Sequence, residues 1–369
     1  MVPQIGQCVK VRWVANSGHE NMDGKMKGMS SSLKFNSTIW VLFFLIAVGL
    51  GYPSLKWYTP STTEFLDDST VYASLLQNGL DAVNSDHRST RLLVPFMARP
   101  IYSLVDGNVG SWNSIQFSML MVGAFFCAFI AVYLVQISEI IKCPKIIGVL
   151  AGFIFMTNFT VPNLYLAGLV DVAECFFVLV LLFALYEKKW GYLPVIAFFA
   201  TLAKETFLPI GISISLSWWC YESFKDKKVN VKSLLWVVLA GFVSVSILIS
   251  LKSFALNQVT MPWEFAKNIE SSYELTIGRA LTEVRHFSYA FVWLLPLALF
   301  RINTLPPKWV ISSISAIASL LVLGCWAGVS GAAMSRYLFN VSGPLLSISA
   351  AFFIHDISRD TNSHTIDRS

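Results

Sequence analysis

Apolar runs close in length to a membrane crossing recur along the whole chain. Examples lie at residues 39–50, 115–135, 175–185 and 234–251, and a helix needs about 20 mainly apolar residues to cross a bilayer. Charged residues make up 13% of the chain and hydrophobic residues 55%, whereas soluble domains contain about 25% charged residues. The pattern argues against a water-soluble fold and predicts an all-α, polytopic transmembrane bundle.

About ten spans follow from the hydrophobic periodicity. They lie at residues 39–55, 112–137, 146–161, 172–186, 191–203, 206–221, 233–255, 287–300, 309–325 and 337–354. The segment 191–221 decides the number, because one helix of this length would measure ~46 Å and the hydrocarbon core is only ~30 Å thick. We divide it at Lys204 and Glu205, since a single span would move the basic residues of 225–232 to the outer side, against the tendency of short basic loops to stay cytoplasmic.

An even number of spans places both chain ends on one side of the membrane. Most of the 27 lysines and arginines then lie on that side, which identifies it as cytoplasmic. We therefore expect a disordered cytoplasmic segment at 1–38, a transmembrane domain at 39–354 and a cytoplasmic tail at 355–369.

Two outer connections, at 56–111 and 256–286, are long enough to have structure of their own. In the first, an aspartate start and a Gly79 stop predict a helix at 68–78, and a second helix is expected at 90–104. The acidic residues favour the outer side, so a site that uses charge is expected there.

Several classes of site lack support. The six cysteines are scattered without C-x-x-C spacing, which favours packing roles over a metal site or a disulfide framework. The formal charge of +5 is explained by membrane orientation rather than by a nucleic-acid partner. The sequence has no P-loop, H-E-x-x-H or G-x-S-x-G motif, so nucleotide-driven pumping, zinc proteolysis and elbow-type hydrolysis are not indicated.

Asp67 and Asp68 open an amphipathic stretch soon after the first span. An aspartate there can cap the helix that follows. A carboxylate at an outer membrane face can also act as a general base toward a hydroxyl or bind a divalent cation. Both roles stay open for this pair.

Arg88 and Arg91 follow in the same outer segment, three residues apart. In a helix they would share one face. Arginines at this depth often reach to lipid headgroups. The alternative is phosphate binding, which suits a planar guanidinium.

Three later segments carry charge beside apolar runs. Asp171 and Glu174 begin the fourth span on one helical face, where Asp171 can also be a cap. Lys204 and Glu205 interrupt two apolar half-helices, as a local ion pair or as part of a lined site. Arg336 begins the last span and can reach to headgroups. Together with loop one, these residues predict a polar cavity that opens outward.

The chain resembles the polytopic membrane glycosyltransferases of the C-type fold (GT-C), including those that take sugars from polyprenyl-phosphate carriers. The resemblance covers most of residues 39–354 and is carried by loose motifs. These are Asp67-Asp68 with Tyr72, Gly79 and Arg91-Leu-Leu-Val-Pro, then Gly168-Leu-Val-Asp171 with Ala-Lys204-Glu205-Thr, and Ser-Arg336-Tyr-Leu with Pro344. The chain departs from the family in its short length, in the lack of a soluble outer domain after the last span, and in Asp-Asp where many members have Asp-Glu.

The resemblance implies an enzyme at the outer, periplasmic face of a bacterial inner membrane. It would move a sugar from a polyprenyl-phosphate donor to a glycan, lipid or protein acceptor. Asp67 or Asp68 would be the general base, and Asp171, Glu174 and Glu205 would orient the acceptor. Phosphate binding would fall to Arg91, Lys204 and Arg336, beside Arg88. No cofactor is fixed, and a divalent cation such as Mg²⁺ or Mn²⁺ is an open alternative.

Two other functions remain alternatives. Interrupted helices and charges at membrane depth also mark transporters and flippases, here for an anionic or lipid-linked solute. A noncatalytic member of a membrane complex is the other, because a fold does not determine a function.

Overall fold

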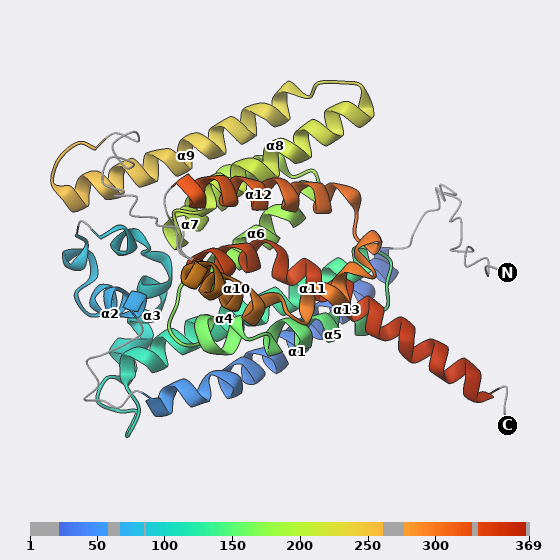
Figure 1. Cartoon of the computed structure of the whole chain (residues 1–369), viewed down its shortest axis with the longest axis horizontal. Coiled ribbons are helices and arrows are strands. Elements are labelled where there is room, and N and C mark those ends of the chain that lie inside the picture. The colour runs from blue at the N-terminus through green and yellow to red at the C-terminus, as the bar shows by residue number, and fades with distance from the viewer. Residues whose placement is uncertain (1–21, 58–66, 85, 261–276, 327–330, 367–369) are drawn as a thin grey trace. The chain divides into compact units, whose positions relative to one another are not determined.

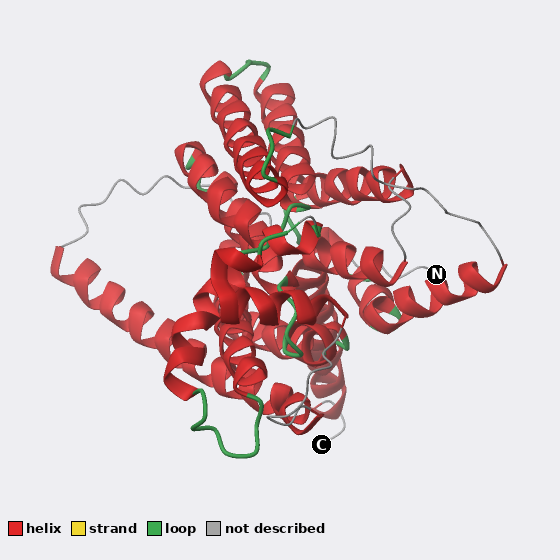
Figure 2. Cartoon of the chain, turned by 90° about the vertical axis from the view of Figure 1, so that its left-hand side faces the viewer, coloured by secondary structure: helices red, strands yellow, loops and turns green. Residues whose placement is uncertain are grey.

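The computed structural model describes residues 22–57, 67–84, 86–260, 277–326 and 331–366. Within these ranges the regular elements are helices and none is a strand, which confirms the all-α prediction (Figure 1, Figure 2). The chain divides into two units, Met1–Thr38 and Ile39–Ser369. The elements of the second unit build the site.

Among the described residues, five helices are long and apolar enough to cross a membrane. The candidate spans are Phe35–Lys56 in α1 (Met22–Trp57), Ser114–Ile140 (α4), Val231–Leu256 (α9), Pro307–Gly324 in α12 (Pro307–Trp326) and Met334–Ser358 in α13 (Gly331–Ile366). The other expected spans fall on helices that are not candidate spans. Five of these are shorter: α5 (Lys145–Thr157), α6 (Asp171–Tyr186), α7 (Leu193–Ala203), α10 (Ile277–Phe291) and α11 (Leu294–Leu299). The sixth, α8 (Phe207–Asp226), has 20 residues but is not apolar enough. The number of ten stays a prediction.

Three expected boundaries differ from the structure. The described parts of the segments expected at 1–38 and 355–369 are helical, because α1 begins at Met22 and α13 ends at Ile366; a helix that has formed extends at little cost per residue. The expected span 287–300 is divided between α10 and α11. Pro296 explains the division, since it has no N–H to donate to Val292 in a continuous helix.

The core of the second unit lies around α4, α5, α6 and α13. α4 packs on α5, and α13 packs on α5, α6 and α11. Gly148 lets α5 approach α4 closely, because a Cβ at this position would lie 2.4 Å from the Cα of Val135. α9 packs on α7 and α8 but leaves most of its apolar surface uncovered, as expected for a helix that faces lipid.

The first long connection folds into helices, as expected. α2 (Asp67–Asn78) ends before Gly79, whose φ of +65° favours glycine. Two 3₁₀ turns follow, η1 (Gly79–Ala82) and η2 (His87–Thr90), and then α3 (Leu93–Val105). α3 begins later than the expected residue 90, because the backbone of Arg91 leaves the helical region at φ −85° and ψ 73°.

The segment 191–221 is divided as predicted. α7 ends at Ala203 and α8 begins at Phe207. Between them Lys204 is extended, with φ −164° and ψ 136°, and its carbonyl accepts from the N–H of Phe207. The Lys204 side chain reaches α6, where it binds Asp171.

Candidate functional site

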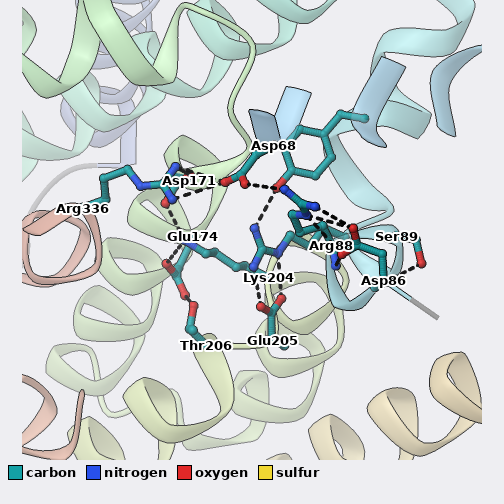
Figure 3. Close-up of polar contacts among 12 residues, drawn as sticks. Asp68, Asp86, Arg88, Ser89, Asp171, Glu174, Lys204, Glu205, Thr206 and Arg336 are labelled. Atoms are coloured by element: carbon teal, nitrogen blue, oxygen red, sulfur yellow. Dashed lines mark hydrogen bonds and ion pairs between the residues drawn. The ribbon is translucent and has the colours of Figure 1, made fainter. Parts of the chain in front are cut away.

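Charged side chains from separate segments of the chain meet in one place, which we call the charged cluster (Figure 3). They come from α2, η2, α6, the α7–α8 turn and α13. The members are Asp68, Arg88, Arg91, Asp171, Glu174, Lys204, Glu205 and Arg336. Of the residues singled out from the sequence, only Asp67 is missing, because its side chain lies outside the described part of the structure.

Asp68 is the point where two arginines meet. Its Oδ1 accepts from Nη1 of Arg88 at 3.1 Å, and its Oδ2 accepts from both Nη atoms of Arg336 at 3.2 and 3.3 Å. Asp68 is the second residue of α2. Its carboxylate therefore joins the first outer segment to the last helix in addition to favouring the helix N-terminus.

Lys204 lies between two carboxylates with no exposure to solvent. Its Nζ donates to Oδ1 of Asp171 and lies 3.6 Å from Oε2 of Glu174, and all three side chains are 0% exposed. The Nζ also lies 3.9 Å from the centre of the Tyr337 ring. Asp171 and Glu174 share one face in the first turn of α6 as predicted, where the helix N-terminus favours negative charge.

Glu174 has further polar partners inside the bundle. It accepts from the hydroxyl of Thr206 and, at 2.5 Å, from the amide of Asn340. Asn340 in turn accepts from the hydroxyl of Tyr165. A buried charge is tolerated when it is paired and hydrogen-bonded in this way.

One oxygen of Asp171 lacks a hydrogen bond. Its Oδ2 is buried without a hydrogen-bond partner, and Nη1 of Arg336 lies 3.7 Å away. Arg336 therefore lies between the carboxylates of Asp171 and Asp68 (Figure 3). Only 15% of the Arg336 side chain is exposed.

Arg91 is held by α2 and the α7–α8 turn. It donates to both oxygens of Glu205 at 2.8 and 2.5 Å and to the hydroxyl of Tyr72 at 2.7 Å. Only 2% of its side chain is exposed. Burial opposes the charge, but Glu205 and Tyr72 more than compensate and raise the pKa of Arg91 well above its ordinary value.

Arg88 has a local partner besides Asp68. Its Nε and Nη2 donate to the carboxylate of Asp86 at 2.7 to 3.1 Å, and the same carboxylate accepts from the Arg88 N–H. The bonds to Asp86, and next those to Asp68, raise the pKa of Arg88. Asp86 thus caps the N-terminus of η2 and orients the Arg88 side chain toward α2.

Four alternatives that the sequence left open are not found in the structure. Arg88 and Arg91 do not share a helical face, because they lie on and after a 3₁₀ turn and bind different partners. Arg91 is buried and does not reach to headgroups. Asp171 binds Lys204 and does not cap α6. The local pair between Lys204 and Glu205 does not form, because each finds a partner on another helix or loop.

A cavity of about 390 Å³ opens beside Asp68 and Arg336. It is large enough for part of a ligand with a sugar and a phosphate. Its other walls come from the segment after α5, from α10 and from α13. They are formed by Phe159, Thr160, Leu164, Leu169, His286, Tyr289, Ala290 and Ser335. The charged cluster therefore meets open space at the Asp68–Arg336 pair.

The cluster does not fit a divalent cation in its present arrangement. Among the described residues, no three histidine, cysteine, aspartate or glutamate side chains are grouped as metal ligands. Asp68, Asp171 and Glu205 each have an arginine or lysine partner. A metal bound at these carboxylates would have to displace those cations, and the divalent cation stays a prediction.

Sequence reasoning missed the neutral partners of the cluster. Thr206 and Asn340 hold Glu174, and Tyr337 lies under Lys204. Asn340 lies within the last apolar span and is fully buried. A polar residue inside an apolar span was the available signal, because such residues need a partner in a membrane.

No protein-family model, curated protein or solved structure matches this chain.

Proposed function

We propose that the chain is a membrane glycosyltransferase that moves a sugar from a polyprenyl-phosphate donor to a glycan, lipid or protein acceptor. One observation supports this most directly: Asp68 and Arg336 contact each other in the wall of the 390 Å³ cavity. In a displacement at an anomeric carbon, a carboxylate can act on the attacking hydroxyl while a neighbouring guanidinium acts on the leaving phosphate. The base is needed at the acceptor and the cation at the leaving phosphate.

In this proposal Asp68 accepts the proton of an acceptor hydroxyl as its oxygen attacks the anomeric carbon. The bond between that carbon and the phosphate oxygen breaks, and the electron pair leaves with the lipid phosphate. Arg336 and Arg88 stabilise the negative charge on the phosphate, since a guanidinium has five N–H donors and can bind Asp68 and phosphate together. Asp67 is a second candidate base.

The remaining members of the cluster have supporting roles. Lys204 holds Asp171 and Glu174 in α6, and Asp171 in turn faces Arg336. The Arg91 guanidinium donates to both oxygens of Glu205 and to Tyr72. We therefore assign Arg91 to stabilising the fold around the site rather than to binding phosphate. Glu174 and Glu205 are then less available to the acceptor than their charge suggests.

The activity is tested with purified full-length chain, polyprenyl-phosphate sugars and candidate acceptors. We expect Asp68→Asn to reduce transfer about 100-fold or more, the usual contribution of a general base. Asp81→Asn is the matched control, because Asp81 is an exposed aspartate of the same loop. Asp67→Asn is assayed together with Asp68→Asn. Full transfer by both Asp67→Asn and Asp68→Asn would contradict the assignment of the general base to this pair.

The site would lie at the outer, periplasmic face of a bacterial inner membrane, in a bundle of ten spans with cytoplasmic termini. Five of these spans separate Asp81 from Lys225, so the two residues should lie on opposite sides. In a cysteine-free background, a membrane-impermeant maleimide should label Asp81→Cys in intact cells and Lys225→Cys only after permeabilisation. Labelling of both from one side would contradict the topology.

Transport of an anionic or lipid-linked solute is the second candidate. It is favoured by the extended break at Lys204, where a buried cation interrupts two apolar helices. Uptake into proteoliposomes that is lost in Arg336→Ala, without any sugar transfer, would favour a transporter. A folded chain with neither activity would favour a noncatalytic membrane component.

A further inference from the structure

A second cavity, of about 500 Å³, lies at the other end of α8 from the charged cluster. Its walls include Glu222 and Asp226 in the last turns of α8, whereas Lys204 lies just before the first turn. α8 has 20 residues, which correspond to ~30 Å of helix. This length equals the thickness of the hydrocarbon core. The second cavity therefore lies toward the opposite end of α8 from Lys204 and the charged cluster.

The second cavity is lined by lysines that have no carboxylate partner. Lys188, Lys189, Lys228 and Lys232 are exposed, and none forms an ion pair with a described carboxylate. Of the two carboxylates in the wall, Glu222 is already paired with Lys308 at 3.1 Å. Asp226 offsets one of the four lysine charges, so the cavity wall keeps an excess of positive charge.

Three tryptophans complete the walls. Trp190, Trp219 and Trp236 come from the turn after α6, from α8 and from α9. The Nε1 of Trp219 donates to the carbonyl of Asn230 at 2.9 Å, which ties α8 to the start of α9. Tryptophan prefers the boundary between hydrocarbon and headgroups. The rings therefore place the cavity at headgroup depth.

An uncovered apolar stripe leads from the cavity along α9. Leu235, Val238 and Phe242 are 62%, 60% and 68% exposed and share one face of the helix. Lys232 and Trp236, one turn apart on an adjacent face, line the cavity. A molecule with a phosphate at the lysines could thus lay acyl chains on the stripe.

We infer that this cavity binds the phosphate of an anionic phospholipid headgroup, with the lysines as cations and the α9 stripe as the surface for the acyl chains. Basic pockets between membrane helices recognise such headgroups. The shared chemistry is a phosphate group, which a soluble phosphate ester also carries. The α9 stripe favours the lipid as its source.

The test measures lipid retention by native mass spectrometry of the full chain in detergent. The probes are phosphatidylglycerol, phosphatidylcholine and free glycerol 1-phosphate. We expect tight binding of phosphatidylglycerol, weaker binding of phosphatidylcholine, and loss of affinity by about tenfold or more in the double variant Lys228→Gln/Lys232→Gln. Lys228→Arg/Lys232→Arg should retain binding, which separates lost charge from lost folding.

The matched control is Lys225→Gln/Lys227→Gln. It removes the same charge from the same stretch, 225–232, but neither residue lines the cavity. Equal losses in the two Gln variants would overturn the inference, because diffuse attraction to a basic loop would then explain binding. Equal retention of phosphatidylglycerol and phosphatidylcholine would also overturn it. Binding of glycerol 1-phosphate as tight as that of the lipid would support the phosphate site and assign it to a soluble ester.

Discussion

Arg336 on α13 binds Asp68 on α2 through both Nη atoms, although 268 residues separate them in the chain. The same guanidinium faces the buried Oδ2 of Asp171 at 3.7 Å. One side chain of the last helix therefore joins the first outer segment to the buried end of α6. The pair also forms part of the cavity wall, so its strength bears on both folding and function.

The Asp68–Arg336 pair should show measurable coupling in a double-mutant cycle. The side chains are only 18% and 15% exposed, so solvent screens the pair less than a surface pair. We expect Asp68→Asn, Arg336→Gln and the double variant to give a coupling of about 1 kcal/mol or more in the free energy of unfolding. Chemical denaturation in detergent measures it.

The exposed pair between Lys145 and Glu139 is the control for this cycle. These side chains are 44% and 39% exposed at an Nζ–Oε1 distance of 2.7 Å, and surface pairs contribute about 0–1 kcal/mol. A coupling at Asp68–Arg336 no larger than that at Lys145–Glu139 would contradict the structural role of the pair.

Lys204→Met should destabilise the protein strongly. The change leaves Asp171 and Glu174 buried without their cation, and loss of one partner of a buried pair costs about 3–5 kcal/mol. Lys225→Met, at an exposed position, should stay within about 0.5 kcal/mol of the parent. Unfolding in detergent gives both values.

Neutral partners should rescue the Lys204→Met variant. Adding Asp171→Asn and Glu174→Gln removes the uncompensated charges while keeping the side-chain sizes, so the triple variant should be more stable than Lys204→Met alone. A triple variant no more stable than Lys204→Met would contradict this prediction and show that Thr206, Asn340 and Arg336 compensate the two carboxylates without Lys204.

Arg91→Lys should cost more stability than Arg88→Lys. A lysine keeps the charge but cannot bind both oxygens of Glu205 and the hydroxyl of Tyr72 together. We expect a loss of about 2 kcal/mol for buried Arg91. Arg88 is 22% exposed and binds Asp86 only two residues away, so its loss should stay below about 1 kcal/mol. Equal losses, measured by denaturation, would contradict the assignment of Arg91 to the fold.

Local patterns in the sequence were enough to predict most helices and one break. The apolar runs indicated α4 and α9, and the charged pair at Lys204 and Glu205 indicated the division between α7 and α8. These features depend on residues close together in the chain. The start of α1 at Met22 and the division at Pro296 were missed, because helix extension and a single proline do not change the apolar pattern.

The partners of the charged residues could not be predicted in the same way. Lys204 and Glu205 are neighbours in the sequence, yet Lys204 binds α6 and Glu205 binds Arg91, 114 residues away. The extended backbone of Lys204 sends the two side chains in different directions. Pairing therefore depends on tertiary packing, which a charge pattern alone does not encode.

Tyr72 should make the stability of the protein depend on pH in the alkaline range. Burial raises the pKa of Tyr72 well above its ordinary value of 10.0, although the charge of Arg91 opposes the shift. Because the pKa is raised in the folded state, the contribution of Tyr72 to the free energy of unfolding is fully present below pH 10. It is lost as the pH rises above 10, where the phenol ionises in the unfolded chain but not in the folded one. Each pH unit in this range costs up to about 1.4 kcal/mol for one such group.

Tyr72→Phe loses the bond from Arg91 but has no phenol to ionise, so its deficit in stability relative to the parent should shrink between pH 9 and about pH 11. Unfolding free energies of both proteins across this range measure the effect, and parallel curves would show that the Tyr72 hydroxyl is not held in its neutral form.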